Sequence, residues 1–163
     1  MIQDKFHDSD EARLDFWFDH VKNVAVGLAY DTEVNMQMFL LQPNGRVDVG
    51  PMEGDPQVML QHILNREQPD GFVLVCEARY KICECTNAHG PEQGCSETEK
   101  RGSIASDANN PEALGILGMM RGNTPRIEMA QITGEIPDRD IGDWSEDGAV
   151  RGALAEIAME AMK

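Results

Sequence analysis

The fold is decided by residues 71–78, which read Gly-Phe-Val-Leu-Val-Cys-Glu-Ala. Nearly all of these residues are apolar. A strand with one face in water alternates polar and apolar residues, whereas a strand buried on both faces reads as a continuous apolar run. We therefore expect 71–78 to be a central strand of a sheet. Cys76 within it is expected to pack as a small hydrophobe rather than to carry chemistry.

Residues 8–30 predict a helix followed by a strand. Asp8 or Ser9 can cap the helix, and Glu11 stands three residues after Asp8, as in a capping box. Four apolar residues then recur at the helical spacing and form one face: Leu14, Trp17, Phe18 and Val21. From residue 24 the larger apolar residues alternate with other residues, so 24–30 predicts a strand: Val24, Val26, Leu28 and Tyr30.

Residues 35–64 predict a hairpin and a second helix. The strands are expected over 35–41 and 46–49, and residues 43–45, Pro-Asn-Gly, are a strong turn signal between them. Asp55 and Pro56 suit the N-cap and the first position of a helix. The buried face of this helix is expected to hold Met59, Leu60, Ile63 and Leu64.

Beyond the central strand, residues 81–111 form a long polar, turn-rich segment of a length that is uncommon inside compact domains. Strands are predicted over 113–120 and 126–133, with a turn at 122–125. Residues 135–147 predict an acidic linker. Its residues from Asp138 onward resemble a calcium loop, but Ala149 stands at the twelfth position, where such a loop needs Glu. A last helix follows, with apolar residues from Ala149 to Met162.

This order of elements predicts an α+β fold with a mainly antiparallel sheet of five to six strands and three helices packed on it, because hairpin connections dominate. The 163 residues are enough for one domain with a real hydrophobic core. We therefore expect a single domain over 1–163, carrying the long cysteine-containing loop at 81–111.

The candidate metal site lies inside that loop and consists of Cys83, Cys85, His89 and Cys95. Thiolates and an imidazole are the ligands of tetrahedral zinc, and four protein ligands would make the site structural. Cys83 and Cys85 depart from the usual Cys-x-x-Cys spacing, although on an extended strand both side chains would point the same way. A solvated loop with reduced thiols, or a disulfide from Cys95 to Cys83 or Cys85, is the alternative.

A cysteine and a glutamate are further candidates for chemistry. A cysteine nucleophile needs a nearby histidine, for which His62 and His89 are the candidates. Glu77, at the end of the buried strand, suits either a catalytic role or an ion pair with Arg79 or Arg126, and the ion pair is the commoner arrangement. The chain contains no phosphate-binding loop, dinucleotide fingerprint, nucleophile elbow or zinc-protease motif.

The charge of the chain bears on its partners. Its 29 acidic and 14 basic residues give a formal net charge of −15. Such a field repels nucleic-acid phosphates and anionic lipid and attracts basic proteins, although solubility or salt adaptation also explains it. The polar, acidic start of the chain does not resemble a signal peptide, and no apolar run has the length of a membrane span. We therefore expect a cytoplasmic protein without membrane association.

Residues 75–80, Val-Cys-Glu-Ala-Arg-Tyr, and 110–114, Asn-Pro-Glu-Ala-Leu, carry a resemblance. The chain over about 70–135 resembles a loose group of small uncharacterised bacterial and phage proteins. It differs from that group in Arg79, which precedes the aromatic residue, and in the cysteine-rich insertion. The resemblance implies a phage or prokaryotic setting, hence the host cytoplasm if phage-encoded, and implies no activity.

These observations favour a small acidic non-enzymatic binding protein of phage or prokaryotic origin that acts on a protein partner, in particular a basic one. An inhibitor that imitates nucleic acid is the narrowest form of this hypothesis. The alternative is a zinc-binding or thiol-dependent enzyme centred on the 83–95 loop. The two hypotheses differ in whether the loop cysteines are needed for function.

Overall fold

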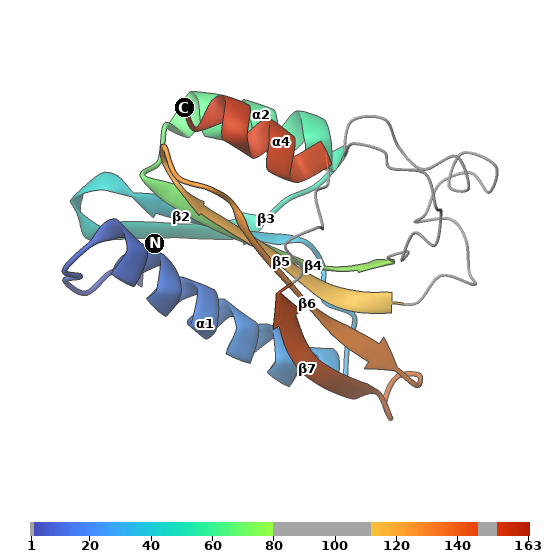
Figure 1. The fold of residues 1–163 in the computed structure, drawn as a ribbon. Helices are drawn as coiled ribbons and strands as arrows, with labels where there is room; N and C mark the ends of the chain where they lie inside the picture. The colour runs from blue at the N-terminus through green and yellow to red at the C-terminus, as the bar shows by residue number, and fades with distance from the viewer. Residues whose placement is uncertain (1, 80–111, 147–152) are drawn as a thin grey trace, which may run out of the picture.

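The computed structural model describes residues 2–79, 112–146 and 153–163, and their strands form one antiparallel sheet in the order β1-β3-β2-β4-β5-β6-β7 (Figure 1). The strands are β1 (Ile2–Gln3), β2 (Gln37–Gln42), β3 (Arg46–Pro51), β4 (Gly71–Arg79), β5 (Glu112–Met120), β6 (Arg126–Thr133) and β7 (Asp140–Glu146). The helices are α1 (Asp10–Ala29), α2 (Pro56–Glu67) and α4 (Ala153–Ala161). The predicted α+β class and its three helices are confirmed within the described residues, whereas the sheet has seven strands rather than five to six.

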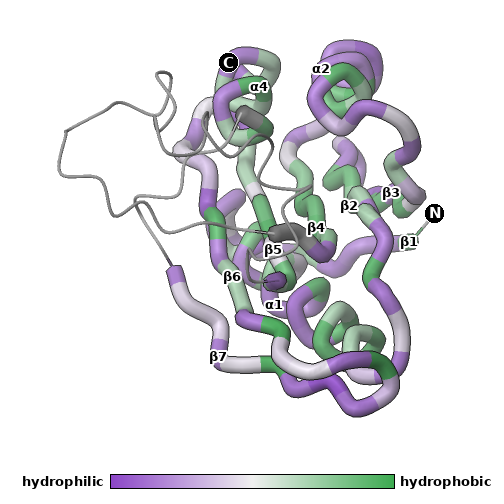
Figure 2. The backbone as a smooth tube through the Cα atoms, turned by 90° about the vertical axis from the view of Figure 1, so that its right-hand side faces the viewer, coloured by the Kyte–Doolittle hydropathy of each residue, from purple (hydrophilic) through white to green (hydrophobic). Residues whose placement is uncertain are grey.

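Strand β4 lies inside the sheet between β2 and β5, as its apolar run predicted. Val73 and Val75 pack against the α1 side of the sheet, and Phe72 and Leu74 pack against the α2 and α4 side. All four side chains are buried. The sheet is therefore the middle of three layers, and Figure 2 shows the hydrophobic residues concentrated in its central strands.

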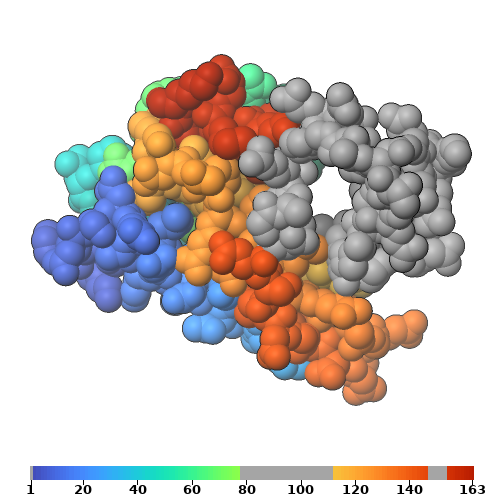
Figure 3. All heavy atoms as spheres, viewed as in Figure 1, coloured from blue at the N-terminus to red at the C-terminus, as the bar shows by residue number. Residues whose placement is uncertain are grey.

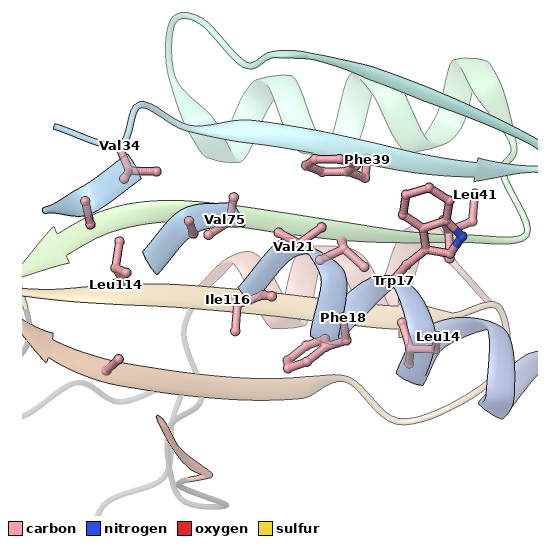
Figure 4. Close-up of a cluster of buried hydrophobic side chains, with 14 of the residues drawn as sticks. Leu14, Trp17, Phe18, Val21, Val34, Phe39, Leu41, Val75, Leu114 and Ile116 are labelled. Atoms are coloured by element: carbon pink, nitrogen blue, oxygen red, sulfur yellow. The ribbon is translucent and has the colours of Figure 1, made fainter. Parts of the chain in front are cut away.

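Helix α1 supplies the core on its side of the sheet. Ser9 is its N-cap, and the Ser9 hydroxyl oxygen accepts a hydrogen bond from the Ala12 N–H at 3.1 Å. The side chains of Leu14, Phe18 and Val21 point from the helix into the sheet (Figure 4). The predicted amphipathic helix is thus confirmed, with the predicted apolar face.

The predicted strand over 24–30 is wrong, because α1 continues through these residues to Ala29. Val21, Ala25 and Ala29 are buried at the four-residue spacing of a helix face, so small alanines carry the core contact. Val24 and Leu28, which suggested alternation, are exposed on the outside of the helix. The large side chains of Val24 and Leu28 therefore suggested a strand wrongly. The four-residue spacing of the alanines is the pattern that indicates the helix.

The hairpin and the second helix are confirmed with small shifts of their ends. Asn44 and Gly45 have positive φ in the turn between β2 and β3. The Asp55 carboxylate accepts a hydrogen bond from the Gln57 N–H at 3.0 Å and so caps α2. Helices α2 and α4 pack together on the second face of the sheet, where α4 contributes Ala155 and Ala158, and Met162 follows the helix into the same core. Ala149 and Val150 of the predicted last helix lie outside the described residues.

The predicted acidic linker over 135–147 is also wrong in part, because residues 140–146 form β7 and pair with β6. Ile141 and Trp144 are the residues of β7 that pack on the α1 core. The remaining residues of β7 are acidic or small. Charged side chains protect an edge strand from pairing with another chain. The same composition lacks the alternating apolar pattern by which a strand is predicted. β1 was missed because its two residues are too few to form a pattern. Among the described residues, no helix is long and apolar enough to cross a membrane.

Two glycines provide a stability test of this packing. Gly27 is an exposed residue in the interior of α1, and a Cβ atom there would meet no atom within 4 Å. We expect Gly27→Ala to raise the free energy of unfolding by about 0.5–1 kcal/mol, because glycine costs a helix that much backbone entropy. Urea denaturation followed by circular dichroism measures the change.

Gly118→Ala is the matched control in the core. A Cβ on Gly118 of β5 would lie 2.7 Å from a ring carbon of Phe18, so the α1–sheet contact would have to shift. We expect this variant to lose about 1–3 kcal/mol through overpacking. Equal effects of the two substitutions would contradict the described packing of α1.

Candidate functional site

The four residues of the predicted metal site, Cys83, Cys85, His89 and Cys95, lie outside the described residues. The structure describes the two points at which their segment joins the sheet. Arg79 at the end of β4 and Glu112 at the start of β5 are partners in the antiparallel register. The segment that carries the candidate ligands therefore begins and ends at neighbouring positions of one hairpin.

A buried ion pair lies at this end of the sheet. Arg139 donates hydrogen bonds from Nη1 to Glu77 Oε1 at 2.6 Å and from Nη2 to Glu77 Oε2 at 2.8 Å. The two side chains are 6% and 10% exposed, respectively. An ion pair for Glu77 was predicted, but with Arg79 or Arg126. Arg126 contacts Asp15 and Glu128 instead.

Arg139 also holds the end of α1. Its Nη1 group donates to the backbone carbonyls of Ala29 and Thr32 at 3.3 and 3.2 Å, while the Val34 N–H donates to Glu77 Oε1 at 2.7 Å. The hydrogen bond to Glu77 raises the pKa of Arg139 above its usual value. The pair thus joins the turn before β7, the end of α1 and the end of β4. Arg139 Nη2 also lies 3.6 Å from Glu112 Oε2. The contacts of the pair with the described residues tie segments of the fold together, which indicates a structural role.

Sequence analysis missed Arg139, although the sequence holds a signal for it. It is the sole basic residue in the acidic stretch 135–147. A carboxylate at the end of a fully buried strand requires a cationic partner, because an unpaired buried charge is costly. A lone arginine in an otherwise acidic segment is a candidate for that partner.

Cys76 sits next to this ion pair and is not suited to act as a nucleophile. Burial, together with the negative charge of Glu77, raises the pKa of its thiol to about 11. The thiol is therefore protonated at neutral pH, whereas the thiolate is the reactive form. This agrees with the predicted role of Cys76 as a packing residue.

A second polar cluster lies at the start of the chain, around Asp4. Burial raises the pKa of Asp4, but hydrogen bonds from His7 and Arg13 outweigh it, and the pKa lies below its usual value. His7 Nε2 lies 2.8 Å and Arg13 Nε 2.7 Å from the Asp4 carboxylate. Arg13 also donates to the Gln42 carbonyl at 2.9 Å. Although a His–Asp pair occurs in many active sites, this one is tied by Arg13 to the β2–β3 turn and secures the N-terminal segment.

Cations of the described residues lie both inside the fold and at the surface. Arg13, Lys22 and Arg139 contact carboxylates within the fold, which are Asp4, Glu128 and Glu77, respectively. Arg126 contacts Asp15, a carboxylate that is 54% exposed, and Arg46, Arg66 and Lys163 are exposed. Within the described part of the chain, the exposed acids outnumber the exposed bases. The residues of 2–79, 112–146 and 153–163 contain no group of three or more His, Cys, Asp or Glu that could hold a metal ion.

Exposed acids gather where α1 ends. Asp31 and Glu33 follow the last turn of the helix, which contains no basic residue. Glu135 and Asp138 belong to the turn before Arg139, and the contacts of Arg139 with Ala29 and Thr32 bring this turn against the helix end. The four carboxylates are exposed at the end where the helix dipole is itself negative. We name these four residues the acidic end of α1.

Comparison with known proteins adds no further constraint on function. No protein-family model, no curated protein and no solved structure matches the chain. The resemblance of residues 70–135 to small bacterial and phage proteins stays a prediction. Function must therefore be inferred from the charges and surfaces of the molecule itself.

The Glu77–Arg139 pair can be tested by substitution. We expect Arg139→Met to lower the free energy of unfolding by about 2–3 kcal/mol, because it leaves the buried Glu77 carboxylate without a cation and two backbone carbonyls without their donor. Arg66→Met is the control, since Arg66 pairs with Glu67 on the exposed surface of α2 and such pairs contribute less than about 1 kcal/mol. Urea denaturation measures both.

The double variant Glu77→Gln with Arg139→Met separates the ion pair from the other contacts of Arg139. If the two side chains act as a pair, its loss of stability is smaller than the sum of the two single losses. Additive losses, or an Arg139→Met effect as small as that of Arg66→Met, would show that the pair does not hold these segments together.

Proposed function

We propose that this protein is a small acidic, non-enzymatic binding protein that acts on a basic protein partner. The observation that carries the proposal is the excess of exposed acids over exposed bases among the described residues. Three of the cations, Arg13, Lys22 and Arg139, are in addition paired with carboxylates within the fold. The resulting negative field at the surface attracts cationic partners and speeds their association.

The setting and the narrower form of this function are part of the proposal. A prokaryotic or phage-infected cytoplasm agrees with the resemblance noted above and with the absence of a membrane-spanning helix among the described residues. Direct binding of nucleic acid is disfavoured by the charge. An inhibitor that imitates nucleic acid would use the same field to occupy a basic nucleic-acid-binding surface.

The electrostatic part of the proposal predicts a binding that depends on salt. The probe is a fluorescent peptide of lysine and serine, about 15 residues long, titrated with the protein and followed by anisotropy. We expect binding at about 50 mM salt and at least tenfold weaker binding at about 200 mM, because salt screens exposed charges. Absence of binding at low salt, or binding that salt leaves unchanged, would contradict the proposal.

A zinc-binding or thiol-dependent function of residues 83–95 is the second candidate. The register of Arg79 with Glu112 favours it, because a loop whose ends are held together can wrap one ion at less entropic cost. We expect about one zinc per chain in elemental analysis of protein purified with reductant and without chelator if this candidate is correct.

The triple variant Cys83→Ser, Cys85→Ser and Cys95→Ser is the control for that measurement, with Cys76 left in place. Zinc that persists in this variant would place the metal elsewhere. A metal-free wild-type protein would exclude the zinc form of the second candidate and leave the acidic surface as the place to look for function.

A further inference from the structure

The outer face of α1 carries a stripe of partly exposed apolar and aromatic side chains. Phe16, His20, Val24 and Leu28 follow one another at intervals of four residues, so they lie along one side of the helix. Phe16, Val24 and Leu28 are 37%, 43% and 50% exposed. The buried face of the same helix is formed by other residues, as described above. We name Phe16, His20, Val24 and Leu28 the α1 outer stripe.

The N-terminal half of the stripe is organised by ring contacts. The Phe16 and His20 rings are nearly parallel, with an interplanar angle of 7° and centroids 6.3 Å apart. The His7 ring lies 5.4 Å from the Phe16 ring, and Lys5 Nζ lies 4.0 Å above it. Phe6, between these two residues, is 86% exposed. An exposed phenyl group thus belongs to the same short segment as the two residues that contact the Phe16 ring.

The position of the stripe leaves it accessible in the described part of the chain. α1 forms the lower left edge of the molecule in Figures 1 and 3, and β6 and β7 form the lower right. Val24 and Leu28 are 43% and 50% exposed, so the C-terminal half of the stripe is open to solvent. In the N-terminal half, by contrast, Lys5 and His7 contact Phe16. Gly27 is on this outer face, and its exposed position leaves room for a partner to approach the helix backbone closely. Apolar side chains that are exposed side by side on a surface can mark an interaction site.

The charges around the α1 outer stripe favour a basic partner on it. The acidic end of α1 lies next to Leu28, and Asp15 and Asp19 lie along the helix with side chains 54% and 65% exposed. A second copy of this chain would bring another formal charge of −15 against these acids, so self-association is disfavoured. A segment with lysine or arginine on one side and apolar residues on the other complements both features.

We propose that the α1 outer stripe and the acidic end of α1 together form the docking surface for a basic amphipathic helix of the partner. The apolar side chains of that helix pack on Val24, Leu28 and the aromatic pair, and its cations contact Asp31, Glu33 and the carboxylates of the 135–138 turn. This is recognition of an amphipathic helix through anchors at helical spacing. The inference rests on the proposed function, because it assigns a surface to the same basic partner.

The test uses two fluorescent peptides with the same number of lysines, each about 15 residues long: the lysine–serine peptide above and a lysine–leucine peptide with leucines at helical spacing. We expect the lysine–leucine peptide to bind at least tenfold more tightly, because only it can use the stripe. We further expect the double variant Val24→Gln with Leu28→Gln to remove this difference. Val58→Gln, at a valine of α2 that is 62% exposed, is the matched control and leaves it in place.

A second pair of variants tests the acidic end at equal net charge. Asp31→Asn with Glu33→Gln changes this end, and Asp143→Asn with Glu146→Gln changes exposed acids of β7. We expect the first pair to weaken binding of the lysine–leucine peptide severalfold more than the second. Circular dichroism melting of every variant shows whether it remains folded.

The outcomes separate the inference from the function on which it rests. If neither peptide binds, both the proposed function and this inference are wrong. If both peptides bind, but the α1 variants behave like their controls, the basic-partner function survives and the docking surface is overturned. Self-association that Val24→Gln with Leu28→Gln abolishes would assign the stripe to a second copy and would also overturn the inference.

Discussion

The burial of β4 on both faces is the constraint on which the rest of the structure depends. Successive side chains of a strand point to opposite sides, so a strand apolar at every position must be covered twice. Val73 and Val75 are covered by α1, and Phe72 and Leu74 by α2 and α4. The three layers follow from this one strand. Each helix then needs only one apolar face, and the opposite face of α1 is left for other uses.

Elements with a strong local signal were predictable from the sequence, and those defined by their partners were not. The apolar run of β4, the turn at 43–45 and the Asp55–Pro56 helix start each carry their cause in a few residues. The second half of α1 was mistaken for a strand because its core contacts are made by Ala25 and Ala29, whose small side chains give little signal. β7 was missed because an edge strand that pairs on one side alone tolerates acids and glycine.

The candidate site was less predictable, because charges reveal their partners only in three dimensions. The sequence shows an excess of acids but not that Arg13, Lys22 and Arg139 contact carboxylates within the fold. Glu77 was expected to have a cationic partner, yet the residue that reaches it is 62 positions away along the chain. The exposed apolar side of α1 was likewise hidden, because the same valine and leucine suggested a strand. The predicted ligands at 83–95 stay a prediction.

The pairing of Arg79 with Glu112 affects how readily the chain between β4 and β5 can accept insertions. Paired strands in a sheet lie about 4.8 Å apart, so the hairpin offers two closely spaced attachment points for the residues between them. Lengthening a flexible segment between fixed ends costs little, since each doubling adds only about 0.6 kcal/mol of closure entropy. New sequence can therefore be accommodated between β4 and β5 without altering the register of the sheet. The same scaffold could carry different insertions at this position while α1 keeps its own surface.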